Sequence, residues 1–316
     1  MRTDAHAPAL ATLREELARP GPPVVVFNKS HSGSRLLAEL LEAAGVFMGA
    51  EQNDSRDALP LLEVVDALVR RYYPDYGPLW DAEDAPDPAV VPLVRAAFAR
   101  HLAGHEPGKP WGWKLCETVY ALPVIDGLFP GARFVHLVRD GRDVAFCDHK
   151  GPTDAFWRKV YFDTERMRTW RGMPLDPGWY RRRPHTFNAQ HWVSSVRVGR
   201  AYGAMLRERC LEVRYEDLCR DFAATAARVL RFVGAPAADE AIERLGPSVR
   251  ATSIGKHRLQ AKRALAEVVE IEKPLLLALG YLASDPEQPR PSLWNLRAVK
   301  LAGRRLRGVP RSAPRK

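Results

Sequence analysis

Residues 24–34, VVVFNKSHSGS, decide the fold. Their first four residues form a continuous β-branched and aromatic run, which is typical of a strand buried on both faces of a parallel sheet. A loop of small polar residues follows, and residues 35–42 then have the apolar spacing of a helix that Gly45 would end. This order of strand, tight loop and helix predicts the first unit of an α/β fold.

Outward from this unit, further apolar runs alternate with helical patterns. The runs at 111–115, 134–138 and 211–215 predict strands, whereas residues 122–129 and 264–279 predict helices. Such alternation predicts a three-layer, doubly wound, mostly parallel sheet flanked by helices. Ligands of these sheets bind at the carboxyl ends of the strands, and polar stretches follow three of the predicted strands.

Charge is distributed unevenly along the 316 residues. The formal net charge is +10, but residues 290–316 hold nine basic residues and no acidic one. The rest of the chain carries 39 basic and 38 acidic residues, so we expect one domain over 1–289 and a flexible basic tail. Within the domain we expect a helical insertion at 60–105 and an aromatic, basic insertion at 150–187. Weak contact of the tail with an anionic surface stays open, and a tail-dependent nucleic-acid-binding protein is a competing interpretation; specific nucleic-acid binding is not expected.

Composition argues against a membrane or extracellular setting. No apolar run reaches the roughly 18 residues that a span needs, and the N-terminus shows no apolar leader core. The cysteines at 116, 147, 210 and 219 have no C-x-x-C spacing and complete no zinc pattern with the histidines. We therefore expect reduced thiols, no metal and a cytoplasmic location.

The loop after the first strand has the properties of an anion site. Small residues between a strand and a helix expose backbone N–H groups, and the helix N-terminus adds a partial positive charge. The stretch lacks the lysine of a nucleoside-triphosphate P-loop, so a kinase with an unusual phosphate loop is a competing interpretation. The candidate binding residues are Lys29, Ser32, Gly33, Ser34 and Arg35, with His31 as a further cation.

A second polar stretch, RDGRD at residues 139–143, follows the strand predicted at 134–138. The planar guanidinium of Arg139 is suited to two phosphate oxygens at once. The alternative is a surface cluster of salt bridges. The position of residues 139–143 directly after a buried strand favours a ligand site over such a cluster.

The first loop resembles the 5′-phosphosulfate loop of the sulfotransferases that use 3′-phosphoadenosine-5′-phosphosulfate (PAPS). Ser32-Gly33-Ser34 matches the Ser-Gly-Ser/Thr core of that loop. His31 stands where the family usually has Lys or Arg, and Arg35 stands where Thr is common. The resemblance implies that Lys29, two residues before His31, supplies the missing positive charge.

Residues 134–145 resemble the 3′-phosphate strand and loop of the same family, and this is the most specific stretch of the chain. The resemblance implies that Arg139 holds the 3′-phosphate. Cys147 stands where the family has an assisting Ser, and a thiol is a poorer hydrogen-bond donor than a hydroxyl. Residues 213–218 resemble a strand ending in Tyr-Glu-Asp, which would place Tyr215 near the adenine.

Two further stretches agree with the same family. Residues 252–258 resemble the late loop that closes on the nucleotide, which implies that Lys256 and Arg258 add charge at the 3′-phosphate and that Ser253 assists. Lys114 resembles a strand lysine that points to the donor. The motifs occur in the family's order over residues 22–282, so the resemblance implies a P-loop-like sulfotransferase architecture.

The resemblance also implies a reaction. A sulfonate group would pass from PAPS to a hydroxyl or amine of a small-molecule, glycan or lipid acceptor, with peptides also open. No metal is expected, because Lys29, His31 or both would neutralise the leaving phosphate. Glu51 is the first candidate for the base that removes the acceptor proton, Glu117 the second and His31 the third.

A catalytically inactive, sulfotransferase-like nucleotide-binding protein is the main alternative. It is suggested by the two departures from the family's pattern, His31 and Cys147. The sequence contains no indication of oligomeric state.

Overall fold

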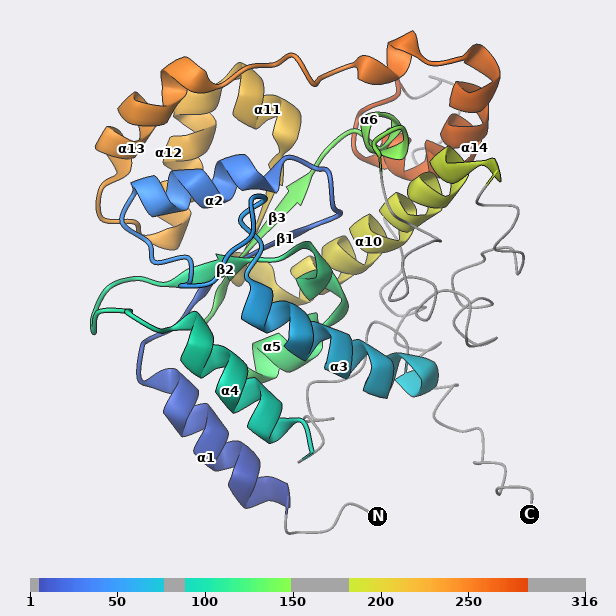
Figure 1. Cartoon of the computed structure of the whole chain (residues 1–316). Coiled ribbons are helices and arrows are strands. Elements are labelled where there is room, and N and C mark those ends of the chain that lie inside the picture. Colours follow the sequence, from blue (N-terminus) through green and yellow to red (C-terminus); the bar gives the residue numbers. More distant parts are fainter. Residues whose placement is uncertain (1–5, 77–88, 149–181, 284–316) are drawn as a thin grey trace, which may run out of the picture.

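The computed structural model describes residues 6–76, 89–148 and 182–283, and a four-stranded parallel sheet lies at its centre (Figure 1). The order of the strands in the sheet is β2-β1-β3-β4, and every neighbouring pair is parallel. The expected parallel α/β sheet is therefore confirmed. The strands are β1 (Val24–Asn28), β2 (Gly112–Lys114), β3 (Arg133–Val138) and β4 (Cys210–Arg214).

Helices cover both faces of the sheet, which explains why β1 is apolar at consecutive positions. Val24 and Val26 pack into a core beneath α2 (Ser34–Ala43), α12 (Phe222–Val233) and α13 (Ala238–Leu245). Val25 and Phe27 point to the other face, because side chains alternate along a strand. The elements that pack on this second face are α1 (His6–Ala18), α3 (Leu59–Tyr76), α4 (Val91–His101), α5 (Leu122–Leu128) and α10 (Pro184–Leu206).

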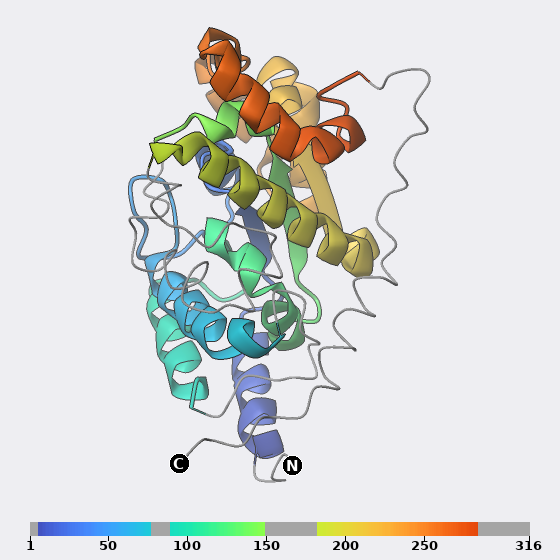
Figure 2. The ribbon, with the colours of Figure 1, turned by 90° about the vertical axis from the view of Figure 1, so that its right-hand side faces the viewer.

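The short helix α6 (Gly141–Ala145) follows β3 and is held by two long helices. It contacts α10 and α14 (Lys262–Ala278), and these two also contact each other (Figure 2). The remaining helical pieces are η1 (Cys116–Tyr120), η3 (Arg207–Arg209), α11 (Tyr215–Arg220), η4 (Gly246–Ser248) and η5 (Lys256–Leu259). No helix in the described ranges combines the length and the apolar character needed to cross a bilayer.

Local sequence features determine where several helices begin. Tyr215 begins α11 instead of ending the strand, because the acidic residues of the first turn stabilise a helix N-terminus there. α10 begins at Pro184, whose fixed φ suits the first helical position. α6 begins at Gly141 because the Asp140 side chain caps it, accepting a hydrogen bond from the Arg142 backbone. Most of the insertion expected at 150–187 lies outside the described residues.

Candidate functional site

The loops that follow β1 and β3 are in direct contact. These strands are neighbours in the sheet, with Asn28 opposite Leu137, so their carboxyl ends open at the same edge. Arg139 Nη1 donates a hydrogen bond of 3.0 Å to the backbone oxygen of His31. The two stretches that carry the strongest sequence motifs therefore form one site.

Arg139 lies at the junction of three segments although only 6% of it is exposed. Its Nη2 donates to the backbone oxygen of Ser253 at 2.5 Å, and its guanidinium carbon lies 4.9 Å from the centre of the Tyr215 ring. Arg139 Nε is buried and has no hydrogen-bond partner among the described residues. Because an unpaired buried donor costs free energy, this atom marks a position where a ligand oxygen is expected.

The first loop is shaped by Gly33 and His31. Gly33 has φ +87°, and a Cβ there would lie 2.3 Å from Tyr215 Cε2, so only glycine lets the loop rest on the Tyr215 ring. His31 also has a positive φ, 68°, although it carries a side chain. The Ser32 hydroxyl closes the turn by donating to the Lys29 backbone oxygen at 2.6 Å, and Ser34 is buried at the start of α2.

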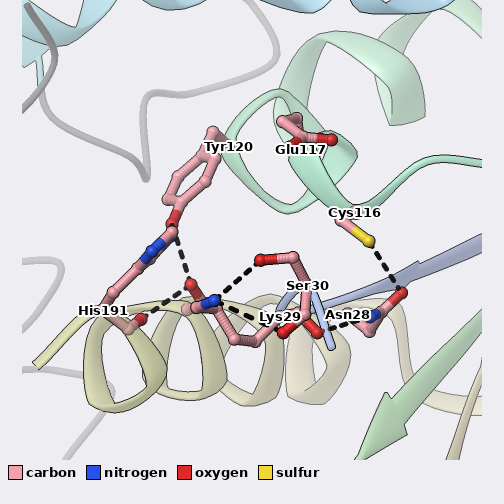
Figure 3. A pocket seen from close by; sticks show the side chains of 8 residues that line it. Asn28, Lys29, Ser30, Cys116, Glu117, Tyr120 and His191 are labelled. Carbon is pink, nitrogen blue, oxygen red and sulfur yellow. Dashed lines mark hydrogen bonds between the residues drawn. The ribbon is translucent and has the colours of Figure 1, made fainter. Parts of the chain in front are cut away.

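The Lys29 ammonium enters a pocket between the first loop, η1 and α10 (Figure 3). Lys29 is 2% exposed, and its Nζ donates to the Ser30 hydroxyl at 2.7 Å. Burial lowers the pKa of Lys29 to about 8 and raises the pKa of Glu117 to about 7. The pocket is lined by Asn28, Lys29, Ser30, Cys116, Glu117, Tyr120, His191 and Ser195.

Three of these residues form a hydrogen-bonded wall that sequence analysis missed. His191 Nε2 lies 2.6 Å from the Tyr120 hydroxyl, which lies 2.8 Å from Ser195 Oγ (Figure 3). Ser195 Oγ in turn donates to the His191 backbone oxygen at 2.8 Å. His191 and Ser195 belong to α10, whereas Tyr120 ends η1. No local motif marks them, because only the packing of α10 on η1 brings them together.

Lys114 is buried beside this pocket and is already paired. Its Nζ donates to Asp57 Oδ1 at 2.7 Å and to the Ser55 backbone oxygen at 2.8 Å. Ligand atoms of Asp57, Cys116 and Glu117 lie within 4.8 Å of one another. The Lys114 ammonium pairs with Asp57, and burial raises the pKa of the Cys116 thiol to about 12, so a metal ion here would have to displace that pairing and the thiol proton.

The structure places two sequence candidates away from the pocket. Glu51 forms an exposed, two-pronged ion pair with Arg100 of α4, at 3.0 and 2.6 Å, and the hydrogen bonds from Arg100 lower the pKa of Glu51. Arg35 lies on the exposed face of α2 and pairs with Glu39 at 3.1 Å. Neither side chain is among the residues that line the pocket.

The remaining sequence candidates lie around Arg139. Cys147, after α6, donates a weak hydrogen bond to the Asp143 backbone oxygen at 3.4 Å, and burial raises the pKa of its thiol. Lys256 and Arg258 are exposed on η5. Desolvation by the surrounding loops and the nearby Lys29 ammonium lower the pKa of His31 to about 4, so its imidazole is neutral near pH 7.

Comparisons with known proteins identify the family. A family model for the sulfotransferase family matches residues 22–239. The match covers more than half of the chain, so the chain belongs to the sulfotransferase family, and its parallel sheet flanked by helices is the P-loop-like sulfotransferase fold. A search of curated protein sequences finds no match.

Solved structures of low identity resemble the chain. The sulfotransferase domain of the Synechococcus PCC 7002 olefin synthase shares 16% identity over 92% of this chain and 97% of that chain, with a TM-score of 0.42. Sulfotransferase STF9 from Mycobacterium avium shares 14% identity over 91% of this chain and 83% of its own, with a TM-score of 0.44. Retinol dehydratase, solved with androsterone and inactive cofactor PAP, shares 16% identity over 91% of this chain and 88% of its own, with a TM-score of 0.38.

Proposed function

We propose that this protein transfers a sulfonate group from PAPS to a hydroxyl or amine of a small acceptor. The observation that carries the proposal is Arg139, a buried guanidinium whose Nε has no partner within the described part of the chain, where the loops after β1 and β3 meet. A phosphate oxygen of the donor would supply that partner, and guanidinium–phosphate pairs are among the strongest charge-assisted hydrogen bonds. Membership of the sulfotransferase family supports the choice of donor.

The two loops offer different groups to the two ends of the donor. Arg139 and the exposed Lys256 would hold the 3′-phosphate. The backbone of residues 29–34, at the start of α2, would hold the 5′-phosphosulfate, with Lys29 as its cation. Gly33 allows close approach to this backbone because it has no side chain.

The pocket contains a base and a cation suited to the transfer. Glu117, with a pKa raised to about 7, would take the proton of the acceptor as the acceptor oxygen or nitrogen bonds to sulfur. The bond between sulfur and the bridging oxygen would break, and its electron pair would stay on the departing phosphate. Lys29 would stabilise that charge. The pairing of Glu51 with Arg100 favours Glu117 over Glu51 for this role.

The acceptor would enter beside the polar wall of Tyr120, His191 and Ser195. Such a wall favours an acceptor that brings a polar group to the base, as a hydroxyl or an amine does. Small molecules, glycans and lipids all carry such groups. Most of the aromatic, basic insertion expected at 150–187 lies within residues 149–181, outside the described ranges.

The test begins with donor binding and ends with transfer. Thermal unfolding is measured with 3′,5′-adenosine bisphosphate (PAP) and, separately, with ATP and magnesium. We expect a larger rise of Tm with PAP, since binding to the native state alone stabilises it. PAPS labelled in the sulfonate group is then incubated with protein and a metabolite extract, and labelled product is expected. Stronger stabilisation by ATP would favour a kinase, and PAP binding without transfer would favour an inactive relative.

A further inference from the structure

His257 is buried although the residues on either side of it in the chain face the solvent. It is 6% exposed, whereas Lys256 and Arg258 on either side are exposed and Leu259 is 86% exposed. A histidine in a basic surface turn normally stays hydrated, so its burial requires a partner that compensates for lost water. That partner is Asp143 of α6, which lies 114 residues away in the sequence.

Asp143 accepts three hydrogen bonds from this loop. Its Oδ1 lies 2.7 Å from His257 Nδ1 and 2.9 Å from the His257 backbone nitrogen, and its Oδ2 lies 2.8 Å from the Gly255 nitrogen. Burial opposes ionisation of Asp143, but the bonds from His257 and Gly255 and the charge of Arg139 outweigh it and lower the pKa. Because an ionised carboxylate only accepts, His257 Nδ1 carries a proton and donates.

The start of α6 thus holds the loop at two points. Arg139, four residues before Asp143, bonds the Ser253 backbone oxygen, while Asp143 bonds Gly255 and His257. Arg139 Nη2 and Asp143 Oδ2 lie 3.6 Å apart, so the two anchors also stabilise each other. The backbone of residues 253–257 is therefore fixed relative to the group that we propose for the 3′-phosphate.

This arrangement determines where Lys256 lies. The backbone N–H groups of Gly255 and His257, on either side of Lys256, are bonded to the buried Asp143, while the side chain of Lys256 is exposed. The Lys256 charge acts against the burial that raises the pKa of the Cys147 thiol, so the ammonium lies within electrostatic range of Cys147. Cys147 stands where the resemblance leads one to expect an assisting hydroxyl near the 3′-phosphate, and the charge of Lys256 would compensate for that loss.

We propose that Asp143 and His257 are positioning residues that hold the 253–258 loop so that Lys256 faces the 3′-phosphate beside Arg139. This inference rests on the proposed function. Neither residue needs to contact the donor; both act through the placement of Lys256. We therefore expect Asp143 and His257 to be needed for tight binding of the donor but not for the chemical step.

The first experiment compares His257→Ala, His257→Asn and Leu259→Ala, with PAP affinity measured by calorimetry and kcat measured at saturating PAPS. We expect PAP to bind about tenfold more weakly to His257→Ala, because this variant loses one charge-assisted hydrogen bond, and we expect kcat to be unchanged. His257→Asn should recover most of this affinity, because its amide nitrogen can replace Nδ1 as donor to Asp143. Leu259→Ala, a change in the same loop without a role in the anchor, should bind as the wild type does.

The second experiment is a double-mutant cycle between His257→Ala and Lys256→Ala. If the anchor acts through Lys256, the double variant should bind PAP no more weakly than whichever single variant has the lower affinity. This coupling would appear although the two side chains are not bonded to each other. Additive losses would overturn the proposal, as would a fall in kcat at unchanged affinity in His257→Ala.

Hydrogen exchange separates this inference from the proposed function. The amides of Gly255 and His257 should exchange faster in His257→Ala than in wild type without any nucleotide, and His257→Asn should restore their protection. If wild type failed to bind PAP, the proposed function would fall. If these amides exchanged at the same rate in His257→Ala as in wild type, the role of His257 as an anchor would be refuted, independently of which donor the protein uses.

Discussion

The Arg139 region and the Lys29 pocket lie at the same edge of the sheet but satisfy their charges differently. Around Arg139, the Asp143 carboxylate receives three hydrogen bonds, which together with Arg139 keep its pKa low despite burial. In the pocket, burial dominates and brings the pKa of Lys29 to about 8 and that of Glu117 to about 7. Groups that stay charged fix geometry, whereas groups that titrate near neutrality can move protons. The first region is thus suited to binding and the second to chemistry.

The largest expected effect comes from removing the base of the pocket. Glu117→Gln should lower kcat by about 10²- to 10⁴-fold, the contribution of a positioned general base, with little change in donor affinity. Glu51→Gln is the matched variant, and we expect it to stay within about twofold of wild type because Glu51 is engaged by Arg100 at the surface. Steady-state rates at saturating PAPS compare the two; the reverse ranking would return the role to Glu51.

A smaller effect is expected from the binding region. Arg139→Lys should raise the KM for PAPS by about 10- to 100-fold, because a lysine cannot reproduce the fork that reaches a phosphate and two backbone oxygens. Its kcat should change much less. Arg35→Lys is the control, since Arg35 is exposed and pairs with Glu39 within its helix. Equal KM values for both variants would show that Arg139 does not hold the donor.

Gly33 connects the two regions, and its replacement should cost stability as well as affinity. Gly33→Ala combines a side chain at positive φ, about 1–2 kcal/mol, with a clash against Tyr215. Gly104→Ala is the matched control, because Gly104 has φ +78° but nothing within 4 Å of the added Cβ. Denaturant unfolding should therefore show a larger loss of unfolding free energy for Gly33→Ala. Equal losses would mean that the Tyr215 ring can move away.

The smallest effect concerns pH. Glu117 must be ionised, so kcat/KM should fall as pH drops through about 7; Lys29 must be charged, so kcat/KM should also fall as pH rises through about 8. At pH 7 the rate should be roughly half of the limiting value. In Glu117→Gln the acidic limb should disappear while the alkaline limb remains. A wild-type profile that is flat from pH 6 to 9 would contradict both assignments.

The fold could be predicted from local sequence patterns. A continuous apolar run such as 24–27 belongs in a strand covered on both faces, and the small residues after it can only form a tight loop. Arg139 could be predicted as well, because it follows a second buried strand and neighbouring parallel strands open at the same edge. These inferences use only information contained within about ten residues of the chain.

The choice between the two carboxylates could not be made in the same way. Glu51 and Glu117 both follow strand-associated motifs, and nothing local shows that one meets Arg100 at the surface while the other is enclosed beside Lys29. Their pKa values depend on burial, which distant elements determine.

The sequence by itself thus determined the sheet, the polar loops that follow two of its strands and the family they indicate, because strand runs, turn glycines and a guanidinium after a strand are local features. The tertiary structure alone decided that Glu117 and Lys29 line one pocket, that α10 supplies a polar wall, and that His257 is anchored on Asp143. The reason is physical: such contacts join residues tens to more than a hundred positions apart, and packing brings them together without a repeated pattern along the chain.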